Sequence, residues 1–152
     1  MKKITSFLFI TLLLISSVPS IGVAASLNKL SAKEVSKQWE VVVGKPDNED
    51  PKANISDKPD LYNVYSLDIK NIGDDNIELV RVEAYRNEPN TSFEYELFTV
   101  ENDAPKKNLY PSFHHTNFPL YAKATELKIV VTWTKKHDQH RKLREQFVFK
   151  QY

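Results

Sequence analysis

The chain contains no cysteine, and this absence excludes several classes of protein at once. Without thiols there is no disulfide framework, no iron–sulfur cluster, no cysteine-ligated zinc and no thiol nucleophile. An excess of one charge is also missing, because 21 Lys and Arg residues stand against 20 Asp and Glu residues in 152. Since a nucleic-acid-binding domain normally carries a basic excess, the composition argues against a nucleic-acid partner.

Glycine is scarce as well, with three residues in the whole chain. The sequence has no glycine-rich phosphate loop and no Gly-x-Ser-x-Gly nucleophile elbow. No helical pattern of roughly 10–15 residues separates the apolar segments, which argues against βαβ units and a nucleotide-binding sheet. We therefore expect a protein that is not an enzyme and that holds no cofactor and no metal.

The N-terminus has the three parts of a secretory signal peptide. Lys2 and Lys3 precede an apolar run over residues 7–15, and Val23 and Ala25 place small residues before a cleavage site. The run is too short for a membrane anchor, which needs about 20 apolar residues. We predict that residues 1–25 are a signal peptide and that the protein is secreted, at the cell envelope or outside the cell, with no membrane span left.

Export is expected to remove about 25 residues. Two of the 21 basic residues and no acidic residue are lost with this segment, so 19 basic residues face 20 acidic ones in the mature chain. Mass spectrometry of the secreted protein should show a chain that begins at Ser26. An intact Met1 would contradict this prediction.

The remaining chain divides into a polar leader over residues 26–38 and a domain over residues 39–152. Ser31 and Glu34 fit a capping box, so the leader is either loose or a short N-terminal helix. A domain of this size buries roughly two-thirds of the surface of its unfolded chain, which is enough for a core without cross-links.

Short alternating segments rich in β-branched and aromatic residues run through the domain. They cover residues 39–43, 61–70, 77–86, 93–100, 125–134 and 143–150. Long loops are expected over residues 44–60 and 101–117, and a charged hairpin loop separates the last two segments. This pattern predicts an all-β fold, an antiparallel sandwich of about seven short strands.

One strand–turn–strand segment resembles bacterial secreted immunoglobulin-like β-sandwich modules. Residues 67–73 (LDIKNIG) end an alternating strand in Asn-x-Gly, and residues 77–82 (IELVRV) begin the next strand with a Val-x-Val pattern. The resemblance implies an immunoglobulin-like sandwich and no particular function. Because the Cys…Trp…Cys signature of antibody domains is absent, the strand order stays open.

The sharpest charge feature is the segment 135–144 (KKHDQHRKLR), with five Lys and Arg residues against one Asp. The candidate ligand-binding residues are Lys135, Lys136, Arg141, Lys142 and Arg144. Concentrated at one end of a near-neutral domain, they favour an anionic cell-envelope polymer as partner. The alternative is a solvated hairpin tip that keeps a strand edge from aggregating.

Histidines and acidic residues offer weaker candidates. His114 and His115 are adjacent, and His137 and His140 are three apart, but neighbours on a strand point to opposite faces. We expect these side chains to be solvated loop histidines rather than ligands of a zinc site. The acidic loop residues offer oxygen ligands for calcium, with a solvated loop as the alternative; they are Asp47, Glu49 and Asp50.

The sequence thus predicts a secreted, non-catalytic binding domain that acts at or outside the cell envelope. One alternative is a protein inhibitor or immunity factor that blocks a secreted protein with the loop 44–60. The other is an extracellular hydrolase whose site is built from loop histidines and acids.

Overall fold

The computed structural model describes residues 25–26, 32–101 and 112–151. Of the predicted signal peptide 1–25 only Ala25 is among the described residues, so this segment stays a prediction. Parts of the predicted leader and of the predicted loop 101–117 also lie outside them. No helix within the described residues is long and apolar enough to span a membrane.

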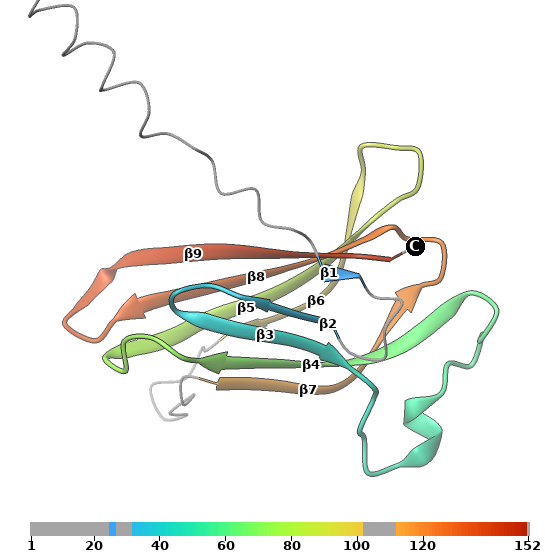
Figure 1. Cartoon of the computed structure of the whole chain (residues 1–152), viewed down its shortest axis with the longest axis horizontal. Coiled ribbons are helices and arrows are strands. Elements are labelled where there is room, and N and C mark those ends of the chain that lie inside the picture. Colours follow the sequence, from blue (N-terminus) through green and yellow to red (C-terminus); the bar gives the residue numbers. More distant parts are fainter. Residues whose placement is uncertain (1–24, 27–31, 102–111, 152) are drawn as a thin grey trace, which may run out of the picture.

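The fold is an all-β sandwich of two sheets, as predicted (Figure 1). The strands are β1 (Ala25–Ser26), β2 (Ala32–Val35), β3 (Trp39–Gly44), β4 (Tyr62–Asn71), β5 (Ile77–Asn87), β6 (Glu94–Glu101), β7 (Ser112–Tyr121), β8 (Glu126–Lys135) and β9 (Asp138–Lys150). One sheet has the order β1-β9-β8-β5-β6 and the other β2-β3-β4-β7. All pairs are antiparallel except β1 with β9. All six predicted strand segments are therefore confirmed.

The core lies between the two sheets and consists of the alternating apolar residues of the central strands. On β8, Leu127, Ile129 and Val131 are fully buried and Trp133 is 6% exposed, so these alternating residues form the inner face of the strand. Trp39 of β3 meets Trp133 across the sandwich with ring centroids 5.6 Å apart in an edge-to-face arrangement. Such aromatic pairs add stabilisation beyond the area that they bury.

The leader contains a strand where the sequence suggests a loose segment or a helix. β2 pairs with β3, from Ala32 opposite Val43 to Val35 opposite Glu40, so the predicted short helix is wrong for these residues. Only Ala32 of β2 is buried. A short, charged edge strand of this kind carries no apolar alternation, and pairing with β3 overrides its local propensity.

The predicted loop 101–117 ends in a second strand that the sequence pattern hides. β7 pairs with β4, but the register shifts between Tyr65 and Leu67. Phe113 lies inward before the shift and Phe118 after it, so the apolar residues change parity along β7. Pro119 is tolerated because β7 is an edge strand. A bulge therefore explains why no clean alternation was visible.

A similar register shift changes which side chains of β6 face the core. The register between β5 and β6 changes beside Ala84, so Phe98, and not its neighbour Leu97, lies opposite Ala84. Phe93 and Tyr95, which the sequence pattern places inward, are 67% and 49% exposed. Tyr95 instead covers the guanidinium of Arg86 at 4.6 Å.

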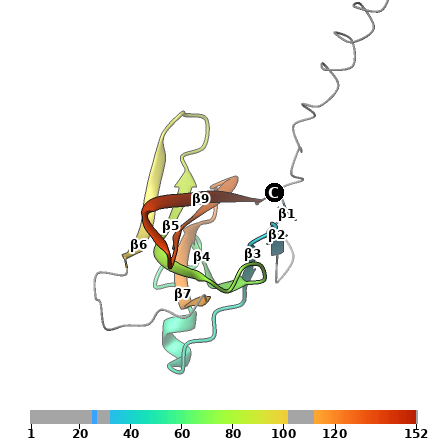
Figure 2. The ribbon, with the colours of Figure 1, turned by 90° about the vertical axis from the view of Figure 1, so that its left-hand side faces the viewer.

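The loop 44–60 runs along the outer side of the four-stranded sheet. It contains one turn of 3-10 helix, η1 (Pro51–Asn54), which Asp50 caps through its side chain. Figure 2 shows this segment on the side of β4 and β7, away from β9. In Figure 1 it lies at the opposite end of the molecule from the β8–β9 turn.

Candidate functional site

The five predicted ligand-binding residues lie on the β8–β9 hairpin, here called the basic arm (residues 135–144). The arm is built of strands rather than the loop that the sequence suggests, because β9 begins at Asp138. Thr134 pairs with Lys142, whereas Lys135 already pairs with Asp138, so the intervening residues of β9 form a bulge. All five basic residues are exposed; they are Lys135, Lys136, Arg141, Lys142 and Arg144.

Backbone and hydroxyl contacts hold the arm in place. The Thr134 hydroxyl lies 2.7 Å from the carbonyl oxygen of Asp138 and 3.1 Å from that of Arg141, which closes the bulge. The backbone N–H of Lys136 donates to the carbonyl oxygen of Asn76 in the β4–β5 turn, at 3.1 Å. The basic side chains therefore project from an ordered hairpin and not from a loose tip.

One of the five basic residues, Arg144, differs from the other four in lying near a carboxylate. Arg144 lies 3.9 Å from Glu83 on the outer face of the five-stranded sheet, where Glu83 also approaches Arg81. The remaining four have no ion pair with any residue that the structure describes; they are Lys135, Lys136, Arg141 and Lys142. These four cations remain available to an anionic partner.

His114 and His115 point to opposite faces of β7, as strand geometry requires, but neither is a solvated loop histidine. His114 lies on the outer face, with Nδ1 2.7 Å from Asp68 of β4 and Nε2 3.3 Å from Asp47 of the loop. His115 is half-buried against Phe98, with ring centroids 4.5 Å apart. Burial lowers the pKa of His115, whereas the hydrogen bond to Asp68 raises the pKa of His114.

The contact between Asp47 and His114 belongs to a set that ties the loop to β7. The backbone N–H of Asp47 donates to the carbonyl oxygen of Thr116 at 3.0 Å, and the Asn48 side-chain amide donates to the Thr116 hydroxyl at 3.1 Å. Asp50 caps η1, so the acidic loop residues do not converge. In the described part of the chain, no group of three or more His, Asp or Glu side chains is arranged to hold a metal.

The opposite pKa directions of the two histidines can be measured. Because the folded pKa of His114 is raised, the stability that its charged form contributes is complete below about pH 6.5. That contribution is lost as the pH rises through the raised pKa. It should amount to less than about 1 kcal/mol, since the side chains are exposed to solvent.

An NMR titration of the imidazole shifts should find His114 titrating above 6.5 and His115 below it. Asp68→Asn should lower the pKa of His114, because it removes the main favourable partner of the imidazolium. Asp138→Asn, on the basic arm, serves as the control and should leave that pKa unchanged. A value for His114 at or below 6.5 in the parent would contradict the prediction.

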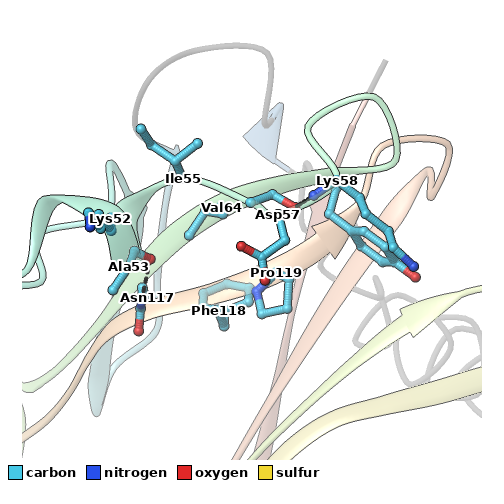
Figure 3. Close-up of a pocket in the computed structure, with 11 residues that line it drawn as sticks. Lys52, Ala53, Ile55, Asp57, Lys58, Val64, Asn117, Phe118 and Pro119 are labelled. Atoms are coloured by element: carbon cyan, nitrogen blue, oxygen red, sulfur yellow. Dashed lines mark hydrogen bonds between the residues drawn. The ribbon is translucent and has the colours of Figure 1, made fainter.

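A cavity of about 600 Å³ lies between the loop 51–58 and the outer face of β4 and β7. Figure 3 shows Lys52, Asp57 and Lys58 on the loop side and Val64 and Pro119 on the sheet side. The cavity lies on the four-stranded sheet, whereas the basic arm belongs to the other sheet.

Comparison with known proteins assigns the chain to a family. The model of the YozF-like secreted protein family matches residues 23–152. The chain belongs to this family. A relative is YozF of Bacillus subtilis (strain 168), which is 33% identical over 138 residues, covering 83% of this chain and 82% of YozF. No solved structure matches the chain. The predicted secretion of the protein is thereby confirmed.

In this YozF-like protein, sequence reasoning located the basic residues but missed the pairing of His114 with Asp68 and the cavity. Both depend on the register of β4 against β7, in which Asp68 lies opposite His114. The signals available beforehand were the length of the loop 44–60 and its acidic residues, which are typical of functional loops.

Proposed function

We propose that this YozF-like protein is a secreted, non-catalytic binding domain that acts at or outside the cell envelope. Its ligand is an anionic envelope polymer, and the basic arm is the binding surface. The observation that carries the proposal is the exposure of four unpaired cations on one ordered hairpin; they are Lys135, Lys136, Arg141 and Lys142. A fifth cation, Arg144, lies on the same strand and extends the surface toward Glu83.

The electrostatics of the arm favour a polyanion over a small ligand. Several cations on one hairpin form a local concentration of charge, which several anionic groups of one polymer can contact at once. Each contact by itself is worth little at an exposed position, so a repeating anion binds better than a single one. The near-neutral charge of the whole chain makes this local concentration the main electrostatic feature.

The two alternatives find less support in the contacts. A hydrolase built on loop histidines would use His114 or His140, but two carboxylates hold the first, and the second is exposed on β9 in the other sheet. An inhibitor that inserts the loop 44–60 into a partner would have to separate it from β7, where Thr116 and Asn117 bind it.

We also infer an immunoglobulin-like arrangement of the strands. The chain crosses between the sheets after β1, β4, β6 and β7, while β8 and β9 form a hairpin. These Greek-key crossings between two antiparallel sheets support the resemblance that residues 67–82 suggest.

Co-sedimentation with purified cell walls tests the proposal. The protein should pellet with the walls at low ionic strength and return to the supernatant as salt is added, because exposed charges are screened. The same preparation should release no product from the walls. A protein that stays in the supernatant at low salt, or that degrades the walls, would overturn the proposal.

A further inference from the structure

The cavity beneath the loop 51–58 is held open by contacts that do not depend on a ligand. The side-chain amide of Asn117 on β7 donates to the carbonyl oxygen of Ala53 at 2.5 Å, which fixes η1 over the sheet. Asn48 and Asn54 close the loop on itself, at 2.8 and 2.9 Å. A site whose walls are ordered in advance loses little entropy when a ligand enters.

The walls of the cavity differ in character. Val64 and Pro119 form an apolar wall on the sheet, and Ile55, which is 68% exposed, extends it from the loop. An isoleucine left this exposed beside a hollow is an apolar surface available for contact. The cavity volume of about 600 Å³ lies within the range of small-ligand sites.

Charges of both signs surround this apolar wall. Figure 3 shows the carboxylate of Asp57 directed from the loop toward β7. Lys52 and Lys58 line the cavity on either side of Asp57 in the sequence. None of the three has an ion pair within the described residues, so both donors and acceptors are free.

An apolar wall beside charges of both signs favours a neutral ligand over an anion or a cation. A small anion with an apolar body would gain from the two lysines but would meet the carboxylate of Asp57, and an apolar cation would meet the lysines. A neutral polyol uses both signs, since each hydroxyl donates to a carboxylate and accepts from an ammonium group. A sugar ring also presents an apolar face of C–H groups that fits the wall of Ile55, Val64 and Pro119.

The geometry points to a neutral saccharide unit as the ligand of this cavity, at a site separate from the basic arm. The charged rim binds its hydroxyls and the apolar wall packs against its C–H face. The inference goes beyond the proposed function, because it does not require an anionic polymer or the cations of the arm.

The test uses three neutral tetrasaccharides, tetra-N-acetylchitotetraose, cellotetraose and maltotetraose, with binding followed by NMR of the labelled protein. At least one should bind with a Kd of about 1 mM or better and shift the amide signals around Asp57 and Val64. A failure of all three to shift those signals would overturn the inference.

Two single variants distinguish a neutral ligand from a charged one. Asp57→Asn and Lys52→Met should each weaken binding of the tetrasaccharide about tenfold, because each removes a charge-assisted hydrogen bond. For an anionic ligand Asp57→Asn would strengthen binding, and for a cationic ligand Lys52→Met would do so. Variants that change affinity in opposite directions would therefore contradict the inference.

A third variant removes the space and leaves the charges. Val64→Trp should abolish binding, because the indole occupies the cavity from β4, where a large side chain suits a strand. Lys37→Met, in the turn between β2 and β3 at the other end of the molecule, is the matched control for Lys52→Met and should bind as the parent does. Unchanged binding in Val64→Trp would place the sugar elsewhere.

Discussion

Replacing Trp133 with Ala is expected to lower the free energy of unfolding by about 3–5 kcal/mol, the range for truncating a large buried aromatic side chain. Trp133 is 6% exposed and packs edge-to-face against Trp39, which is fully buried. The substitution leaves a cavity between the two sheets and removes the aromatic pair as well. Urea denaturation, followed by the fluorescence of Trp39, measures the loss.

Lys128 on the same strand provides the matched comparison. Its side chain lies on the outer face, paired with Glu94 and 5.1 Å from the ring of Tyr85. Lys128→Ala should cost less than about 1 kcal/mol, because exposed ion pairs and cation–π contacts contribute little. Equal losses in the two variants would mean that the faces of β8 are assigned wrongly.

Strands whose inner face keeps one parity were predictable from the sequence alone. Residues 125–134 show this best, because Leu127, Ile129, Val131 and Trp133 alternate along one face and all four reach the core. The register shift in its pairing with β5 places the extra residue on β5, between Leu79 and Arg81, so β8 itself keeps the period of two as far as Thr134. The same reason explains the success over residues 39–43.

Segments where pairing breaks the period were not predictable. β7 changes parity between His115 and Phe118, and β6 does so at Leu97, so local alternation gives the wrong face or none. β2 has almost no apolar residue inside and exists because β3 offers it a free edge. These outcomes are set by partners distant in the sequence, which a single-chain pattern does not record.

The candidate sites divide in the same way. The basic arm was predictable, because its charges are contiguous in the sequence and a hairpin keeps them together. Two other features were not predictable: the contact of His114 with Asp47 and Asp68, and the cavity beneath η1. Each joins the loop 44–60 to residues on two strands. Only the register of β4 against β7 brings them together.

Reversing the four unpaired cations of the basic arm to Glu should release the protein from purified cell walls. The variant carries Lys135→Glu, Lys136→Glu, Arg141→Glu and Lys142→Glu. Each exposed charge contact contributes about 0.5 kcal/mol or more, so four reversals should weaken binding at least about 30-fold. The fold should survive, because these side chains are exposed and make no core contact.

A second charge-reversal variant distinguishes the effect of the basic arm on binding from the effect of net charge. Four exposed lysines elsewhere are changed to Glu in it; they are Lys37, Lys45, Lys70 and Lys123. This variant has the same net charge as the first one but keeps the cations of the basic arm. It should therefore stay bound to the walls at low salt. Added salt should release it over nearly the same concentration range as the parent. Equal release of both variants would contradict the basic arm as the binding surface.

The rival interpretation, that the charges only protect a strand edge, makes a different prediction for a neutral arm. With the same four arm residues changed to Ser, that interpretation expects ready aggregation and unchanged wall association. The binding surface predicts the reverse order: a soluble protein whose release needs less salt, because fewer charges hold it. Sedimentation with walls across a salt series, beside light scattering without walls, decides between them.

A charge-reversed protein that still co-sediments with an unchanged salt profile would end the proposal for the arm.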